Sequence, residues 1–575
     1  MAKKSKKAVR STRKKPAPEP SRWRPMLRAF WKWFGLPGLL YLVIFFLSQP
    51  HYLTNFSSGF YLDGGDGFQN VWNIWWVNDS LAVHHNNPYF TTTLHWPHGT
   101  TLLPQTMNII NGLIAVPLIN IFGFSLVQAT NFAVVFAFMF GGVTMFWFIQ
   151  KLYSKYWVSL IAGALFTFST YHMAHAQGHL QLVTFEFIPL FFLAFWTFLD
   201  KVRYRYAVLA SGALFLVLLS DYYYLFWSVI VGGMWFAWKL YRKEFKLTKQ
   251  HIKVLSVFAG LSAALIGPML ISLTRLNNRD PLTGFHDPMV FVLDPLSVVI
   301  PGGSWYWSSL TDWHWMHLPF AAETSVFFGY GLLTLVAIAF YKSFIVRWRT
   351  KKPTVPSDIY FWWIVLFVFG VLALGPRLKV YAQTLDRLPL PYELMEKLFP
   401  TLKISGMPVR WILVSLIASI VIGSYVLTKL NIKTRKGQIV LALFVLVSVV
   451  DLWPAPLPLE KPEDHTQPYV YALKALPNGA VIDNGAETGG EQLLHQTIHE
   501  KPMAFGYVTR LPKSADEKDF HIFAALEEGR FDQLCQTYRV RYVTTPAYRP
   551  INTTYPVIYD DDQTLIYDFK NSDNC

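Results

Sequence analysis

The sequence predicts an all-α polytopic membrane domain followed by a small α/β domain, and three observations support this. Of the 575 residues 53% are hydrophobic and only 15% charged, whereas a soluble domain carries about 25% charged residues. The apolar residues come in long blocks such as "FAVVFAFMFGGVTMFWFI" (132–149), which contains no charge and is long enough for a membrane span. After about Pro456 the chain becomes polar, with short strand and helix patterns.

This change of composition predicts three regions. Residues 1–34 form a basic, disordered cytoplasmic tail, 35–455 the transmembrane domain and 456–575 a small extracytoplasmic domain. The start, "MAKKSKKAVRSTRKKP", lacks an apolar core and a small-residue cleavage site, so we expect no cleavable signal peptide. The net charge of +15 does not indicate nucleic-acid binding, because much of it lies in the tail and in short loops between spans.

The apolar blocks predict about eleven transmembrane helices, several of them short. The segment Ile109–Gly123 is also apolar, but it is short and contains Pro117, which is more typical of a re-entrant or interfacial segment. If it does span, one of the short helices does not. The expected spans are 36–49, 126–150, 156–172, 181–200, 206–220, 222–238, 254–274, 325–343, 358–376, 409–428 and 438–454.

Clusters of Lys and Arg fall between alternate spans, as in "KLYRKEFKLTKQHIK" (239–253) and "RWRTKK" (347–352). The positive-inside rule then predicts a multi-pass cell-membrane protein with a cytoplasmic N-terminus and an extracytoplasmic C-terminal domain. The chemically unusual residues gather on the outer side, whereas the spans are nearly free of charge. A pore or transporter would instead place polar groups inside its spans.

The last region shows its own pattern of elements. "AVIDN" (480–484) and "VRYVTTP" (540–546) read as strands, and "GGEQLLHQTIHEKP" (489–502) as a helix. "PVIYDDDQTLIYDF" (556–569) reads as a hairpin with its turn at 560–563. Cys535 and Cys575 lie here; a disulfide and two unrelated thiols are both compatible with the sequence.

The first outer loop contains "LDGGDGFQNVWNIWW" (62–76), which places Asp63 and Asp66 among three glycines. These acids could simply shape a turn or cap the helix that follows. The loop is long, however, and rich in Trp, Asn and His. Aromatic rings and amides beside carboxylates suit a sugar, whose faces stack and whose hydroxyls need partners.

Three histidines, His172, His175 and His179, are spaced to share one face of a helix end. Gly178 interrupts that helix, so the spacing favours a polar surface beside a membrane-edge cavity over a histidine-only metal site.

Two acids lie at neighbouring outer edges. Glu186 stands inside an apolar block, where a lone carboxylate is costly and therefore a functional candidate. Asp221 precedes Tyr222–Tyr224, and interfacial tyrosines are usually belt residues.

Later outer loops carry further charge. The loop 275–323 holds Arg279, Asp294 and Glu323, and the loop before the penultimate span holds six basic residues ending in Lys403 and Arg410. Such positive charge runs against the positive-inside bias. Either the loop is merely solvated, or some of these side chains hold a phosphate, which Arg binds bidentately.

With these residues assembled, the chain resembles bacterial members of the GT-C superfamily of integral-membrane glycosyltransferases that carry a C-terminal outer domain. The resemblance covers most of the chain, but in loose patterns. The similar blocks are "LDGGDGFQNVWNIWWV" to "GTTLL" (62–103), "HMAHAQGHLQLVTFEFIPL" (172–190), "LDPLSVVIPG" to "GLLTL" (293–335), "ISGMPVRWILVSLIASIVIGS" (404–424) and "LPNGAVIDNG" to "VTRLP" (476–512).

The resemblance implies a GT-C-like fold and a hexosyltransferase-like enzyme that takes a sugar from a polyprenyl-phosphate donor on the outer side of the membrane. It implies that the essential acid of the first outer loop is Asp66 or Asp63, and that a long loop follows the seventh span, here 275–323. Displacement at the anomeric carbon would invert configuration. No clear second acidic pair is present, so a divalent cation (Mg²⁺ or Mn²⁺), held by Asp63 and Asp66 if at all, remains open, with Glu186 or the histidines as substitutes.

The expected roles follow. Arg410, helped by Lys403 or Arg279, offsets charge on the leaving phosphate. Asp66 or Asp63 accepts the acceptor's proton or binds the cation. We expect the substrate to be bound by His179, Glu186, Asp221, Asp294 and Glu323.

The partners expected are membrane lipid, a polyprenyl-phosphate-linked sugar and a glycan, lipid or protein acceptor, with no nucleic acid. The C-terminal domain either binds the acceptor or caps the structure. Two alternatives remain: a non-enzymatic cell-envelope assembly or scaffold protein, for which Asp63 and Asp66 would be dispensable, and a lipid-linked sugar transporter, which predicts charges within spans.

Overall fold

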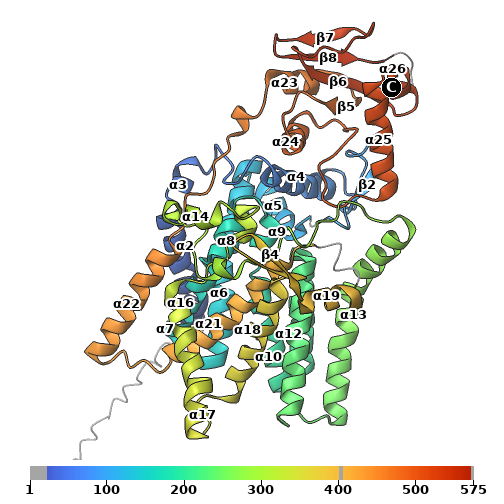
Figure 1. The fold of residues 1–575 in the computed structure, drawn as a ribbon. Coiled ribbons are helices and arrows are strands. Elements are labelled where there is room, and N and C mark those ends of the chain that lie inside the picture. The colour runs from blue at the N-terminus through green and yellow to red at the C-terminus, as the bar shows by residue number, and fades with distance from the viewer. Residues whose placement is uncertain (1–22, 106, 400–405, 571–575) are drawn as a thin grey trace, which may run out of the picture.

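A computed structural model describes residues 23–105, 107–399 and 406–570. A bundle of long helices forms one part of the molecule, and a small α/β unit stands at one end of it (Figure 1). The helix α4 (Asp66–Asn78) and the loops around it lie between the two parts.

Six segments are long and apolar enough to cross a membrane, and the chain is a multi-pass membrane protein. Helices also occupy the other five expected ranges, but they do not meet the same criterion, so the number of eleven spans stays a prediction. The six segments are Trp23–Ser48, Leu126–Tyr153, Leu180–Lys201, Lys249–Arg279, Tyr330–Thr350 and Pro408–Leu427.

The helices of these segments have the following bounds. They are α1 (Trp23–Phe30), η1 (Trp31–Gly35), α2 (Leu36–Ser48), α6 (Leu126–Tyr153), α9 (Leu180–Val183), α10 (Phe187–Lys201), α13 (Lys249–Arg279), α16 (Tyr330–Phe340), η5 (Tyr341–Val346), α17 (Arg347–Thr350), η6 (Pro408–Trp411) and α21 (Ile412–Leu427). The other bundle helices are α7 (Tyr156–Thr167), α11 (Tyr204–Ser220), α12 (Tyr222–Tyr241), α18 (Ser357–Ala373) and α22 (Arg435–Leu452).

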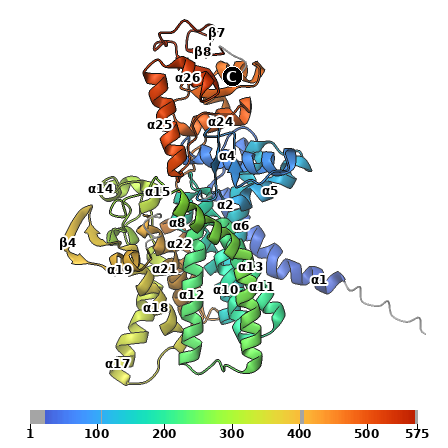
Figure 2. The same ribbon diagram turned by 90° about the vertical axis from the view of Figure 1, so that its right-hand side faces the viewer.

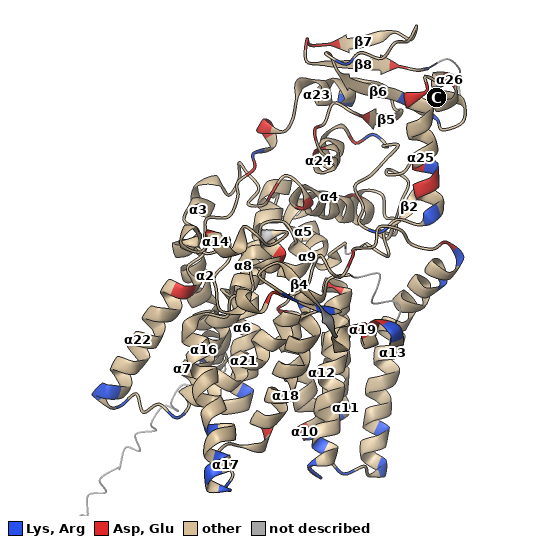
Figure 3. Ribbon diagram, viewed as in Figure 1, with Lys and Arg blue, Asp and Glu red and all other residues tan. Residues whose placement is uncertain are grey.

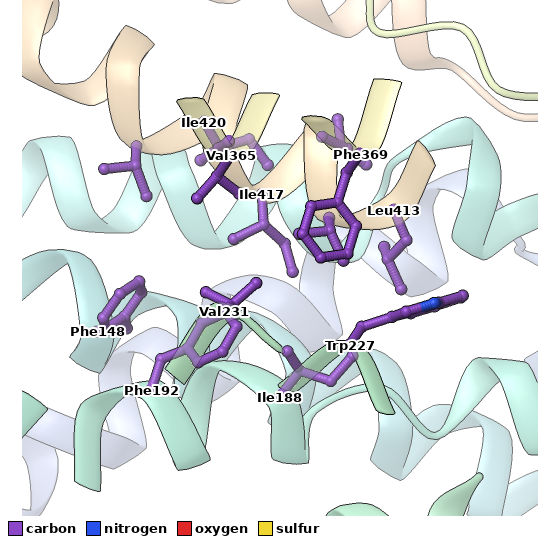
Figure 4. Close-up of a cluster of buried hydrophobic side chains, with 14 of the residues drawn as sticks. Phe148, Ile188, Phe192, Trp227, Val231, Val365, Phe369, Leu413, Ile417 and Ile420 are labelled. Carbon is purple, nitrogen blue, oxygen red and sulfur yellow. The ribbon is translucent and has the colours of Figure 1, made fainter. Parts of the chain in front are cut away.

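The bundle is held by one large apolar core, part of which is drawn in Figure 4. Phe148, Phe192, Trp227 and Ile417 meet there from α6, α10, α12 and α21. In contrast, the apolar window of α13 is only 11% buried, which leaves its side chains for lipid.

The loop 49–108, predicted to be the first outer loop, and its helices cover one end of the bundle. The helix α5 (Ile109–Asn120) packs against α4, because Gly112 lets Val77 approach where a Cβ would collide with it. Both lie across the end of the bundle rather than along it (Figure 2). The other elements of this end are α3 (His51–Asn55), η2 (Asp79–Val83), β1 (Phe90–Thr91), β2 (Thr100–Thr101) and α8 (Thr170–His175).

The later outer loops add short elements at the same end. They are η3 (Pro295–Val298), η4 (Ser308–Leu310), α14 (Asp312–Trp315), α15 (Ala321–Thr324), the hairpin β3 (Arg377–Val380) and β4 (Gln383–Pro389), and α19 (Pro391–Leu398).

The α/β unit contains a four-stranded sheet in the order β5-β6-β8-β7. β5 and β6 are parallel and the other pairs antiparallel, with Val543 opposite Tyr567. The expected strands, helix and hairpin are confirmed, whereas α23, α25 and α26 have no expected counterpart. The elements are η7 (Pro462–Asp464), α23 (Pro468–Ala475), β5 (Ala480–Asp483), α24 (Gly489–His499), α25 (Lys513–Glu527), α26 (Phe531–Gln536), β6 (Val540–Pro546), β7 (Val557–Asp560) and β8 (Thr564–Asp568).

Charge is distributed unequally along the bundle. Lys and Arg mark the end remote from the α/β unit, at the tips of α12, α13 and α17 (Figure 3). Basic residues of this kind anchor a membrane protein at an interface.

Candidate functional site

The glycine-rich turn before α4 is shaped by Asp63. Its Oδ1 accepts hydrogen bonds from the backbone N–H groups of Gly65 (3.0 Å) and Gly67 (2.9 Å). This fold-back places Asp66 at the first position of α4. Asp63 is therefore engaged by its own turn, whereas Asp66 faces outward from it.

The glycines are explained by close approaches from two other segments. A Cβ on Gly490 would lie 2.5 Å from the carbonyl oxygen of Gly64 and 2.7 Å from that of Gly65. Gly178 similarly makes room for the carboxylate of Asp63. The turn is thus a packing junction between the bundle and the start of α24.

Asp66 is the accessible acid of the cluster, with 37% of its side chain exposed. Its Oδ2 lies 3.0 Å from Nε2 of His179, and its Oδ1 accepts a hydrogen bond from the hydroxyl of Tyr507 at 2.8 Å. One oxygen is therefore bound from the bundle and the other from the α/β unit.

Behind His179 lie His175 and Glu323. The Nδ1 atoms of the two histidines are 3.2 Å apart. Nε2 of His175 is 3.9 Å and Nε2 of His179 3.8 Å from the Glu323 carboxylate. α8, the loop after it and α15 bring these side chains together, although Glu323 is far away in sequence.

Glu323 forms a bidentate ion pair with Arg410, which stands in η6 at the start of a span. Nε and Nη2 of the guanidinium contact the carboxylate, and both side chains are buried. The guanidinium carbon lies 5.3 Å from the ring centroid of Tyr223. A buried pair of this kind needs good geometry to offset its desolvation.

The pKa shifts separate the two acids of the turn. Burial raises the pKa of Asp63, although the hydrogen bond from Gly67 opposes this. Burial alone would also raise the pKa of Asp66, but His179, Tyr507 and Arg410 together lower it below its usual value. Asp66 is therefore the carboxylate that stays ionised.

The two histidines differ in the same way. Burial lowers the pKa of His175 well below its usual value. Burial would lower the pKa of His179 as well, but Asp66 and Glu323 raise it. Burial would raise the pKa of Glu323, yet Arg410 and His175 hold it well below the usual range. The network therefore shifts the pKa values of the two histidines in opposite directions, down for His175 and up for His179.

His175, His179 and Glu323 could also hold a cation. One ligand atom from each lies within 4.8 Å of the others. Nε2 of His175 is buried and has no hydrogen-bond partner, which fits a position reserved for an ion. The sequence leaves Asp63 and Asp66, or Glu186 and the histidines as substitutes, as candidate ligands, and the structure groups two of these histidines with Glu323.

Of the other residues expected at the site, Asp221 lies closest to this cluster. Its carboxylate caps α12 by accepting a hydrogen bond from the backbone N–H of Tyr223 at 2.6 Å, so it orients the ring under Arg410. Glu186 is buried with neither carboxylate oxygen hydrogen-bonded.

The remaining expected residues lie elsewhere or are not described. Asp294 caps η3, accepting from Leu296 N at 3.0 Å. Arg279 is exposed at the end of α13. Lys403 and Cys575 lie outside the described residues.

Sequence reasoning missed the contribution of the α/β unit, namely Tyr507 and the Gly489–Gly490 pair. The available signal was "TGGEQ" (488–492), a second glycine pair at a helix start. It could be matched with "DGGDG" (63–67) only once the two were known to touch.

Comparison with models of known protein families identifies the family of this chain. The family model of the Domain of unknown function DUF6311 matches residues 37–453, so the chain belongs to this family. A search of curated protein sequences found no match.

Several solved structures are similar in fold, and they are membrane glycosyltransferases of the GT-C type. The mycobacterial arabinofuranosyltransferase AftD gives a TM-score of 0.49 at 11% identity, over 90% of this chain and 35% of its own. The Archaeoglobus fulgidus oligosaccharyltransferase gives 0.47 at 12%, over 91% and 70%. ArnT from Cupriavidus metallidurans, bound to undecaprenyl phosphate, gives 0.45 at 11%, over 93% and 98%.

Proposed function

We propose that the protein is a membrane glycosyltransferase that moves a sugar from a polyprenyl-phosphate donor to an acceptor at the membrane face carrying the α/β unit. The observation that carries the proposal is the chain of contacts from an accessible carboxylate, Asp66, through His179 and Glu323 to the buried guanidinium of Arg410. A carboxylate that only shaped a turn would not need contacts with His179, Glu323 and Arg410.

The orientation follows from charge. The Lys- and Arg-rich tips of α12, α13 and α17 mark the cytoplasmic side under the positive-inside rule. The Asp66 cluster, at the opposite end, then faces outward, together with the α/β unit. A lipid-linked donor would present its phosphate at this edge.

The reaction needs one proton acceptor and one charge stabiliser. Asp66 takes the proton of the acceptor hydroxyl, whose oxygen attacks the anomeric carbon. The bond from that carbon to the phosphate oxygen breaks, and polyprenyl phosphate leaves with the bonding electrons. Nε and Nη2 of Arg410 are bound by Glu323, so Nη1 is the nitrogen offered to the phosphate.

A divalent cation would be held by His175, His179 and Glu323. Two imidazole nitrogens and one carboxylate suit Mn²⁺ or Zn²⁺ better than Mg²⁺. When bound, the cation would supply Lewis-acid stabilisation of phosphate charge. His179 would then release its proton, since only neutral imidazole ligates.

The test measures release of polyprenyl phosphate, the product common to every acceptor. Membranes containing the full chain are given a panel of labelled polyprenyl-phosphate sugars together with the acceptors of the native envelope. We expect Asp66→Asn to lower release by about 10³-fold, within the range for losing a general base, with an unchanged membrane level. Asp79→Asn, an acid-to-amide change at the other end of the same helical segment, is the matched control.

The outcome separates the alternatives. Undiminished release by the Asp66→Asn variant would refute the proposal. Full function of that variant in cells would favour a scaffold or a transporter, for which this carboxylate has no chemical task.

A further inference from the structure

The segment 503–511, which joins α24 to α25, leaves the α/β unit and crosses onto the membrane domain. Its start pairs with the first outer loop, through Met503 N to Thr93 O (2.8 Å) and Trp96 N to Met503 O (3.0 Å). Its end pairs with the loop after α13, through Thr283 N to Leu511 O (2.8 Å). This crossing segment is therefore fixed at both ends by the part of the chain that carries the site.

Tyr507 lies in the middle of the crossing segment, and its position is set by two further contacts. Its backbone carbonyl accepts a hydrogen bond from Nε2 of Gln69, in α4, at 2.6 Å. Its ring packs against Gly489, where a Cβ would lie 3.1 Å from ring carbons. The hydroxyl is thereby aimed at Oδ1 of Asp66, at 2.8 Å.

The carboxylate of Asp66 is held at both oxygens by groups from different parts of the chain. His179 binds Oδ2 and Tyr507 binds Oδ1. A carboxylate with both oxygens bound has a fixed plane, so its remaining lone pairs point in set directions. His179 alone would leave the plane free to rotate.

We propose that Tyr507 is a positioning residue for Asp66, so that the α/β unit completes the catalytic site instead of acting only as an acceptor-binding module or a cap. The role in catalysis rests on the proposed function; the positioning of the carboxylate does not. The phenol orients the base and reduces its basicity, while Asp66 itself makes the contact with the acceptor.

The charges around Asp66 are consistent with this contact. The pKa of Asp66 is lowered against burial by His179, by the hydrogen bond from Tyr507 and by the charge of Arg410. Burial and the neighbouring Asp66 carboxylate raise the pKa of Tyr507, so it remains a donor across the working range. The charged or titratable groups around Asp66 are Asp63 from the turn, His179 after α8, Glu323 from α15, Arg410 from η6, His286 from the loop after α13 and Tyr507.

The direct experiment examines the Asp66 carboxylate without turnover, at one fixed neutral pH. Infrared difference spectra between the wild type and Asp66→Asn isolate its antisymmetric carboxylate stretch. In a Tyr507→Phe background, compared with the same pair in the wild type, we expect this band to move to higher wavenumber and to broaden, because the carboxylate loses a hydrogen bond and its fixed plane. Tyr548→Phe, at an 88% exposed tyrosine of the same unit, should leave the band unchanged.

A second substitution keeps the shape of the side chain. Replacement of Tyr507 by 3-fluorotyrosine strengthens the donor and should move the band to lower wavenumber, which a packing defect would not do. An unchanged band in both variants would overturn the inference. Donor cleavage then reports on catalysis: it should fall about tenfold in Tyr507→Phe and persist in the 3-fluorotyrosine variant. A shifted band with no cleavage by the wild type would refute the proposed function alone.

Discussion

The cluster around Asp483 in the α/β unit and the cluster around Asp66 differ in how completely their polar groups are hydrogen-bonded. In the α/β unit, Asp483 accepts from Tyr469 (2.8 Å), Thr544 (2.7 Å) and His495 (2.8 Å), and the other nitrogen of His495 lies 2.7 Å from a backbone carbonyl. In the Asp66 cluster, Nε2 of His175 has no hydrogen-bond partner, and the side chain of Asp66 is accessible to solvent.

The difference supports the proposal that the Asp66 cluster is the one that takes part in a reaction. A closed network of hydrogen bonds stabilises the fold and offers no group to a ligand. An open network retains unused donors and acceptors beside an accessible carboxylate, at a cost in stability that folding alone would not require. We therefore assign the Asp483 cluster to stability and the Asp66 cluster to function.

The largest expected effect comes from breaking the ion pair between Glu323 and Arg410 in the Asp66 cluster. Glu323→Gln leaves the guanidinium of Arg410 buried without its counter-charge. We expect a loss of about 3–5 kcal/mol in the free energy of unfolding and a fall in donor cleavage of at least ~10²-fold. Thermal unfolding in detergent and the cleavage assay measure the two effects.

The control is Asp312→Asn, an exposed acid in the same outer loop, which should change neither quantity. If Glu323→Gln has the stability and the donor cleavage of the wild type, the ion pair with Arg410 contributes neither to folding nor to the reaction, which would contradict the account.

Breaking the Asp483 cluster should lower stability but leave donor cleavage intact. Asp483→Asn should destabilise the α/β unit by about 3 kcal/mol, because it leaves His495 without its charged partner. At temperatures where the unit stays folded, donor cleavage should persist. Hydrogen exchange of β5 and β6 measures the loss, with the exposed Glu463→Gln as control.

The pH dependence of that cluster has a defined sign. Burial would raise the pKa of Asp483, but His495 and Thr544 lower it to about 2. The stabilisation from this carboxylate is thus present above the usual carboxyl range and is lost as the pH falls through about 2.

Loss of donor cleavage in a folded Asp483→Asn variant would contradict the assignment of the Asp483 cluster to stability alone.

The smallest effect concerns the cation. Below the raised pKa of His179, a proton competes with the ion for that imidazole. Affinity for Mn²⁺, followed by electron paramagnetic resonance, should fall about tenfold per pH unit there. His179→Gln should weaken Mn²⁺ binding and reduce the dependence of the affinity on pH. Unchanged Mn²⁺ affinity in this variant would show that the ion binds elsewhere.

Much of the fold could be predicted from local patterns. Apolar blocks mark the helices of the bundle, and period-two runs mark β5, β6 and the β7–β8 hairpin. Asp66 could be singled out from its long loop rich in Trp, Asn and His, His179 from the spacing of the histidines, and Arg410 from basic residues that run against the positive-inside bias. Composition cannot show which of these side chains meet, since Asp66 and Tyr507 are brought together only by tertiary packing.

The site differs from the expectation for the same reason. The spacing of His172, His175 and His179 suggests one helix face, but His172 hydrogen-bonds backbone carbonyls, with Nδ1 2.7 Å from Thr167 O. Glu323 takes the third place instead, from a loop that no local pattern links to the histidines.

The most direct test is a cryo-EM structure of the full chain with polyprenyl phosphate added. The account predicts density for the phosphate between Asp66 and Arg410, within hydrogen-bond distance of Nη1, with the lipid chain running between helices of the bundle. Phosphate bound at the basic tips of α12, α13 and α17, or at a site remote from Asp66, would contradict it.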